Sequence, residues 1–284
     1  MIPAAFEYER AESLADALAA VAAKDTKVIC GGQTLIPLLR FRLTQPQRVV
    51  GIGHLEALRG IRIADGVVRI GAATTYRELL DSQELRAAAP LIVEVTSNIG
   101  DIQVRNLGTI GGALVHADPS ADMPGAMLVL DATFHVQSSS GARTIKARDF
   151  FRGAFETALE AGELLVAIEL PVAGRGSGSA YETFEQAASG YPIVGAAAVV
   201  TRSGTKVTSA SLAFTGLTDA PFSATAVSGL VGTSGDADAI ARIAALAAQG
   251  VDANVDIHAG AEYRLHLAAV AARRALTSAI ARAT

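Results

Sequence analysis

The chain has 284 residues, of which 50% are hydrophobic and 18% are charged, and its formal net charge is −4. This composition predicts a globular protein with a large core, and the scattered Lys and Arg residues exclude the basic footprint of a nucleic-acid binder. The single cysteine, Cys30, excludes an internal disulfide framework and a cysteine-rich metal centre held by this chain alone.

The first 55 residues predict a small α/β lobe. Ser13 is a suitable N-cap for a helix with Leu14, Leu18 and Val21 on one face. Residues 26–30 read as a short buried strand, and we expect a helix at 35–43 and a second strand at 48–52.

Residues 56–172 predict a second lobe. Asp65-Gly66 between two alternating apolar runs, 60–63 and 67–71, is a strong hairpin signal. Helices are expected from Thr74 or Thr75 and from Pro90 onwards, while 98–108 shows no regular period and predicts irregular backbone that lines a pocket. Strands or short buried segments are expected at 127–130, 133–137 and 164–170.

Residues 173–179 are rich in Gly and Ser and predict a linker, with a domain boundary near residue 172. Beyond it, strands are expected around 181–187, 193–202 and 207–214, followed by helices at 236–249 and 259–283. The chain is therefore expected to divide into domains at 1–172 and 180–284, the first with lobes at about 1–55 and 56–172.

The first residues lack the basic start and apolar core of a signal peptide, and no apolar run approaches the roughly 18 residues of a spanning helix. We therefore expect a cytoplasmic protein without a membrane span.

Two glycine-rich loops about 80 residues apart are the most informative feature. Gly31 and Gly32 follow the predicted strand at 26–30, and Gly111 and Gly112 follow the irregular segment. Glycine tolerates positive φ and lets main-chain amides approach a ligand closely, so two such loops predict one diphosphate held from both sides. Taken singly, each loop is better explained as an ordinary tight turn, and it is the pairing of the two loops that favours a ligand site.

The common nucleotide fingerprints are missing. The sequence contains neither a Gly-x-Gly-x-x-Gly that enters a helix after the first strand nor a Gly-x-x-x-x-Gly-Lys-Ser/Thr. This argues against a Rossmann site and a P-loop.

Over essentially its whole length the chain resembles the FAD-binding medium subunits of molybdenum hydroxylases, the group that contains carbon monoxide dehydrogenase and bacterial xanthine dehydrogenases. The resemblance rests on four motifs, the residues at 6–8, 30–38, 102–112 and 116–124. It implies an α+β fold of the vanillyl-alcohol-oxidase (PCMH) type. Two α/β lobes would enclose FAD, and a C-terminal α/β domain with a small antiparallel sheet and helices would cover the flavin.

The same resemblance implies a cofactor site. The two loops would hold the diphosphate and nearby sugar groups, Asp122 would accept hydrogen bonds from cofactor hydroxyl groups, and Tyr191 would lie over the flavin ring. The expected cofactor-binding residues are Cys30, Gly31, Gly32, Gln33, Thr34, Leu35, Thr109, Ile110, Gly111, Gly112, Ala113, Asp122 and Tyr191. No catalytic or metal-binding residue is expected on this chain.

Several of these positions have simpler readings. Asp118 and Asp122 are also suited to capping a turn or a helix near Ser120, and His116 to a structural hydrogen bond. Arg105 either contacts phosphate or holds its own loop through backbone carbonyl groups. Cys30 reads as a small core residue beside the first loop.

Two positions depart from the family pattern. Ala113 stands where Asn or Ser often follows the paired glycines, which removes one side-chain hydrogen bond to the cofactor. Glu185 and Ser189-Gly190 stand where relatives carry basic residues and a Gly-Asp-aromatic sequence. The loss of positive charge argues against a nicotinamide dinucleotide as electron acceptor.

The function implied is that of an electron-transfer subunit, which passes electrons from partner iron–sulfur clusters through FAD to a terminal acceptor. The implied partners are an iron–sulfur small subunit and a molybdenum-cofactor large subunit, assembled as a dimer of heterotrimers. Two alternatives stay open, a self-sufficient flavin oxidoreductase of the same cofactor fold and a cofactor-less scaffold subunit.

Overall fold

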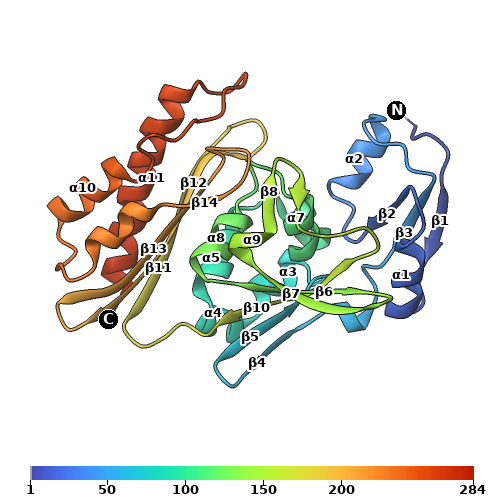
Figure 1. The fold of residues 1–284 in the computed structure, drawn as a ribbon, viewed down its shortest axis with the longest axis horizontal. Coiled ribbons are helices and arrows are strands. Elements are labelled where there is room, and N and C mark those ends of the chain that lie inside the picture. Colours follow the sequence, from blue (N-terminus) through green and yellow to red (C-terminus); the bar gives the residue numbers. More distant parts are fainter. Residues whose placement is uncertain (1) are drawn as a thin grey trace.

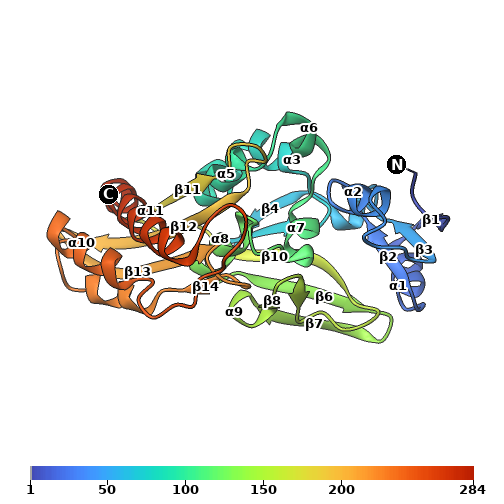
Figure 2. The same ribbon diagram turned by 90° about the horizontal axis from the view of Figure 1, so that it is seen from above.

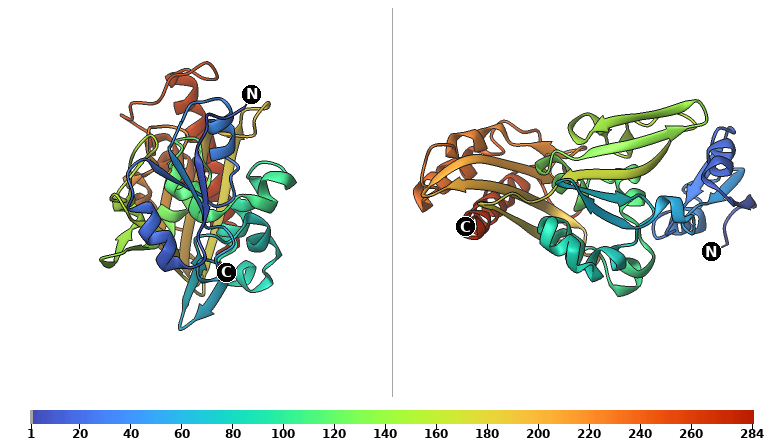
Figure 3. Two further views of the ribbon diagram at one scale, coloured as in Figure 1. Left: turned by 90° about the vertical axis from the view of Figure 1, so that its right-hand side faces the viewer. Right: turned by 90° about the horizontal axis from the view of Figure 1, so that it is seen from below.

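Three bodies follow one another along the chain in the computed structural model, which describes residues 2–284. Figure 1 shows an N-terminal lobe at one end, a central lobe in the middle and a C-terminal sheet with its helices at the other end. The right-hand view in Figure 3 shows the same order, with the two ends of the chain in different bodies, whereas the left-hand view looks along the molecule from its N-terminal end.

The N-terminal lobe is a three-stranded parallel sheet with two helices. The two helices and two of the strands were predicted, whereas the strand at Glu7–Arg10 was not. The strands pair in the order β1-β3-β2. Ser13 caps the first helix and accepts a hydrogen bond from the Asp16 amide at 3.1 Å. The second helix ends earlier than expected, because Arg42 takes a positive φ of 56°. The elements are β1 (Glu7–Arg10), α1 (Leu14–Val21), β2 (Thr26–Ile29), α2 (Leu35–Arg40) and β3 (Arg48–Gly51).

The central lobe is built on a five-stranded antiparallel sheet in the order β4-β5-β10-β6-β7. Asp65 and Gly66 both take positive φ, which confirms the predicted hairpin. Its strands are β4 (Ile61–Ala64), β5 (Val67–Gly71), β6 (Thr133–Ser138), β7 (Gly141–Lys146) and β10 (Leu164–Pro171), with a small ribbon of β8 (Phe151–Gly153) and β9 (Glu156–Thr157). Its helices are η1 (Glu56–Leu58), α3 (Tyr76–Asp81), α4 (Gln83–Ala88), α5 (Pro90–Asn98), α6 (Ile102–Leu107), α7 (Ile110–His116), α8 (Met123–Val129) and α9 (Ala147–Phe150).

Two predictions in this lobe were wrong. The segment expected to be irregular contains α6, which Asp101 caps by accepting a hydrogen bond from the Val104 amide at 2.8 Å. This helix has no buried residue, so it leaves no apolar period in the sequence. The segment at 127–130 belongs mainly to α8, which is buried on nearly all sides and therefore reads like a buried strand.

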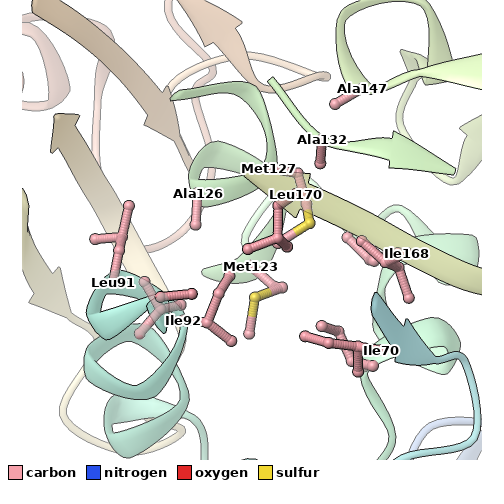
Figure 4. Packing of buried hydrophobic residues seen from close by; sticks show 14 of the residues in the cluster. Ile70, Leu91, Ile92, Met123, Ala126, Met127, Ala132, Ala147, Ile168 and Leu170 are labelled. Carbon is pink, nitrogen blue, oxygen red and sulfur yellow. The ribbon is translucent and has the colours of Figure 1, made fainter. Parts of the chain in front are cut away.

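The core of this lobe lies between the sheet and its helices. Figure 4 shows Met123 and Met127 of α8 between the helix residues Leu91 and Ile92 and sheet residues that include Ile168. The α8 helix is thereby fixed in the middle of the molecule, where it also contacts strands of the C-terminal domain.

Thr75 gives α3 a reciprocal cap. Its hydroxyl accepts from the Glu78 amide at 3.2 Å, and the Glu78 carboxylate accepts from the Thr75 amide at 2.7 Å. We expect Thr75→Ala to lower the free energy of unfolding by about 1 kcal/mol. Urea denaturation measures this, with Thr75→Ser as the matched control that keeps the oxygen. Equal losses in both variants would contradict the role of the cap.

The C-terminal domain is a four-stranded antiparallel sheet in the order β11-β12-β13-β14, covered by helices. The predicted linker is shorter than expected, because Ser177 already begins β11 and pairs with Thr201. A Cβ on Gly178 would lie 2.1 Å from the carbonyl oxygen of Ala279 in the helix α11 (Ala261–Arg282), so this helix lies directly on β11. The elements are β11 (Ser177–Glu185), β12 (Pro192–Ser203), β13 (Lys206–Thr215), β14 (Phe222–Ser223), η2 (Thr225–Leu230), α10 (Ala237–Leu246) and α11 (Ala261–Arg282).

Within residues 2–284, no helix combines the length and apolar character that crossing a membrane requires.

Candidate cofactor site

The first glycine loop joins β2 to α2 and presents unused backbone donors. The amides of Gly32, Gln33, Thr34 and Leu35 donate to no carbonyl or side chain within residues 2–284. Gly32 takes a positive φ of 72°, and the Thr34 hydroxyl makes no capping bond to the helix. Consecutive free amides at a left-handed residue form a concave anion site, so this loop fits a diphosphate.

The amides of the second glycine loop, unlike those of the first, mostly form hydrogen bonds within the protein. Thr109 caps α7 and accepts a hydrogen bond from the Gly112 amide at 3.2 Å. The Ile110 amide donates to the Thr74 carbonyl, and the Gly111 amide to the Ala72 carbonyl at 2.9 Å. These bonds fasten the loop to the central lobe, so only its exposed edge at Gly112 is open to a ligand.

The two loops meet, although they are far apart in the sequence. A Cβ on Gly31 would lie 2.0 Å from the Leu107 carbonyl oxygen and 2.9 Å from the Cα of Gly108. A Cβ on Gly111 would lie 2.5 Å from the Ala72 carbonyl oxygen. Figure 2 shows α2 and α7 at the junction between the N-terminal lobe and the rest of the molecule. Glycine at position 31 therefore permits backbone contact between the N-terminal and central lobes, and glycine at position 111 permits close packing within the central lobe.

Cys30 and Arg105 support the loops. Burial raises the pKa of the Cys30 thiol, although a hydrogen bond with the Thr109 side chain opposes the shift. Cys30 is partly buried and packs against the apolar core of the N-terminal lobe beside the first loop, as the sequence predicts. Arg105 donates to the carbonyl oxygens of Ile99 and Gly100 at 3.0 and 2.7 Å. Its side chain holds its own loop, which was one of the two readings from the sequence.

Asp122 precedes α8 but does not cap it. Its Oδ1 atom accepts a hydrogen bond from the Tyr181 hydroxyl at 2.8 Å, and both side chains are buried. Asp118 does cap a turn, because its Oδ1 accepts from the Ser120 amide at 2.8 Å. The two acidic residues therefore have different roles.

Burial raises the pKa of Asp122 to about 7; the hydrogen bond from Tyr181 lowers it and the charge of Glu185 raises it. The folded chain therefore keeps a proton that the unfolded chain releases between about pH 4 and pH 7, so stability falls across that window and levels off above it. We expect Asp122→Asn to remove this fall. The free energy of unfolding of the variant, relative to the wild type, should rise by about 1.4 kcal/mol per pH unit inside the window.

Urea denaturation of the flavin-free chain at several pH values measures this difference. A difference that stays constant from about pH 5 to pH 7 would contradict the raised pKa.

Tyr191 follows the turn between β11 and β12 and is 49% exposed. It borders a hollow of about 280 Å³ lined by residues from the central lobe and the C-terminal domain, among them Asp118, Gln186, Asp256 and Arg264. His116 lies against Phe155, with ring centroids 5.0 Å apart, and burial lowers its pKa. Its Nε2 lies 3.9 Å from Asp118 Oδ2, so within residues 2–284 the side chain packs against Phe155 without the expected structural hydrogen bond.

Sequence reasoning missed Tyr181 and Arg264. Tyr181 lies within an ordinary strand pattern, and Arg264 lies in a helix otherwise rich in alanine. Neither residue belongs to a motif, and each contacts its partners only through the tertiary fold.

Comparisons with known proteins agree with this architecture. Residues 4–173 match the family described as the FAD binding domain in molybdopterin dehydrogenase, and residues 179–279 match the CO dehydrogenase flavoprotein C-terminal domain. The chain is 41% identical to the carbon monoxide dehydrogenase medium chain of Afipia carboxidovorans, over 100% of this chain and 99% of the relative. It is 36% identical to the glyceraldehyde dehydrogenase medium chain of Sulfolobus acidocaldarius, over 97% and 98% of the two chains.

Solved structures give the same result. A chain of the Cu,Mo-CO dehydrogenase superposes with a TM-score of 0.96 at 40% identity, with full coverage of both chains. A chain of quinoline 2-oxidoreductase from Pseudomonas putida 86 superposes with a TM-score of 0.95 at 33% identity, covering 100% of this chain and 99% of that one. The chain therefore belongs to the family of FAD-binding medium subunits of molybdenum hydroxylases.

Proposed function

We propose that this chain holds FAD where the two glycine loops meet, and passes electrons from partner iron–sulfur clusters to a terminal acceptor. The observation that carries the proposal is the run of four free amides from Gly32 to Leu35, placed where Gly31 touches the second loop. A diphosphate is the part of FAD that such a site recognises. FAD itself supplies the redox chemistry when bound.

The other predicted residues have roles that follow from their positions. The Thr34 hydroxyl is free to hydrogen-bond a ligand oxygen, whereas Gln33 already donates to the Gly31 carbonyl at 3.3 Å. The exposed edge at Gly112 and Ala113 lets the cofactor approach the backbone of α7. Asp122 accepts from a sugar hydroxyl group, because a buried carboxylate suits a hydroxyl donor and repels phosphate. Tyr191 lies beside the flavin ring.

We also propose a division into an FAD-binding domain at 1–172 and a domain at 180–284 that covers the flavin. The partners are an iron–sulfur small subunit and a molybdenum-cofactor large subunit, and the assembly is a cytoplasmic dimer of heterotrimers. The names of the relatives support a multisubunit assembly, because they describe medium chains or subunits of dehydrogenases.

The hollow beside Tyr191 bears on the terminal acceptor. Asp118 and Asp256 line it, and its buried cation, Arg264, donates to Asp256 at 2.5 Å. Glu185 adds negative charge near Asp122. Such surroundings disfavour an anionic nicotinamide dinucleotide as the acceptor.

Affinity purification through a tag on this chain tests the proposal. We expect two further subunits to co-purify, with bound iron and molybdenum, and the flavin to be reduced only when those subunits are present. Oxidation of an organic substrate by the isolated chain at the rate of the complex would favour a self-sufficient oxidoreductase. A complex with all subunits and metals but no flavin would favour the scaffold.

A further inference from the structure

One contact joins the C-terminal domain to the candidate cofactor site through a buried polar pair. Tyr181 on β11 reaches Asp122 at the start of α8, and their exposed fractions are 5% and 6%. The hydroxyl donates to Oδ1 at 2.8 Å. The second carboxylate oxygen, Oδ2, accepts no hydrogen bond from another residue in the part of the chain that the structure describes.

The groups that face this carboxylate provide no cation. Glu185 on the same strand as Tyr181 acts on it as a like charge, and the phenols of Tyr76 on α3 and Tyr191 lie within electrostatic range. Among residues 2–284, the Tyr181 hydroxyl is thus the one side-chain donor that holds the Asp122 carboxylate. The orientation of this carboxylate therefore depends on a single neutral hydrogen bond.

The position of the Tyr181 hydroxyl is itself narrowly defined. A Cβ on Gly195 of β12 would lie 2.1 Å from the Tyr181 oxygen and 2.8 Å from the Thr215 oxygen. Only glycine leaves room for the phenol at this point of the sheet. The strand pairing of the C-terminal domain therefore fixes the position of the Tyr181 hydroxyl, and this hydroxyl fixes the orientation of the Asp122 carboxylate.

The pair also connects to the glycine loops. Tyr76, whose pKa is raised by burial and by the charge of Asp122, packs with its ring against Gly108, just before the second loop. Its amide donates to the Gly108 carbonyl at 2.9 Å, and Gly108 is next to Gly31 of the first loop. A short series of contacts thus runs from the C-terminal domain to the place where the loops meet.

We propose that Tyr181 is a positioning residue for the cofactor: it holds one oxygen of Asp122, so that the other oxygen is available to a hydroxyl group of the flavin's sugar chain. The inference rests on the proposed function and adds a residue that touches no cofactor. It follows that the C-terminal domain contributes to flavin affinity from a buried position, and that this contribution depends on the ionised form of Asp122.

The test is the dissociation of FAD from the complex isolated through this chain, measured by the fluorescence of released FAD between about pH 5 and pH 9. We expect Tyr181→Phe to weaken FAD binding about 10-fold near pH 7, since a hydrogen bond to an ionised group is lost. As the pH is lowered, the FAD affinity of the variant should begin to fall at a higher pH than that of the wild type. The reason is that the Asp122 carboxyl group holds its proton more tightly without the hydrogen bond from Tyr181. Above that pH the difference from the wild type should narrow.

Two variants complete the design. Asp122→Asn should bind FAD weakly and without this pH dependence, because the titrating group is gone. Tyr263→Phe, at an exposed tyrosine of α11, is the matched control and should behave as the wild type.

The outcomes separate the two claims. A wild-type complex without FAD would overturn the proposed function and this inference with it. Weak binding by Asp122→Asn, together with wild-type affinity and pH dependence for Tyr181→Phe, would overturn only the positioning role. If Tyr181→Phe does not fold, Tyr181→2,3-difluorotyrosine keeps the ring and makes the hydroxyl a stronger donor. With that substitution, FAD affinity should begin to fall at a lower pH than in the wild type. If affinity falls at the same pH as in the wild type, the positioning role of Tyr181 is overturned.

Discussion

Gly31→Ala is expected to yield a folded chain that retains little or no FAD. The added Cβ would lie 2.0 Å from the Leu107 carbonyl oxygen, a distance that no real Cβ contact shows, and the obstructing atoms are backbone. The first loop must therefore move away from the second, which displaces the free amides from Gly32 to Leu35. A binding site that depends on fixed donors loses affinity when those donors move.

The measurement is the flavin content of the complex isolated through the variant chain, with circular dichroism to check the fold. Gly174→Ala is the matched control, because a Cβ at Gly174 would meet no atom within 4 Å. Full flavin content in both variants would show that the meeting of the loops is not the cofactor site.

Arg264→Met is expected to destabilise the chain by about 3 kcal/mol, because it breaks a buried polar network. Arg264 is 2% exposed and donates to the carbonyl oxygens of Ile193 and Gly216 at 2.5 and 2.6 Å. Both of these bonds come from Nη1, and Nη2 donates to the Asp256 carboxylate. Met fills much of the same volume, but it leaves two carbonyl groups of the C-terminal sheet without a donor.

Urea denaturation measures the loss, and Arg273→Met on the exposed side of the same helix is the control. We expect less than about 0.5 kcal/mol for the control, as for most exposed substitutions. Similar values for the two variants would contradict a structural role for Arg264.

Local sequence signals predicted much of the fold. Asp65-Gly66 set a hairpin through its own backbone preferences, and Ser13 capped α1 through a contact three residues away. The errors occurred where local signals fail. The exposed α6 helix has no apolar period, and α8 is apolar on nearly all sides because it packs between two bodies.

In the candidate site, too, the features set by local sequence could be predicted, and those set by tertiary contacts could not. The glycine loops are visible in the sequence, because their backbone needs are local. Their meeting at Gly31 and Leu107 is a tertiary contact. Tyr181 reaches Asp122 across 59 residues, and Arg264 reaches Ile193 across 71, so no spacing rule could have linked them. The different use of the amides in the two loops also emerged only from their hydrogen bonds.

The proposed function depends above all on FAD bound at the junction of the two glycine loops. The most direct test is the absorption spectrum of the complex isolated through this chain, with the released cofactor identified by mass. We expect flavin bands and about one FAD for each copy of the chain. A folded chain that assembles with its partners, contains no flavin and takes up none when FAD is added would contradict it.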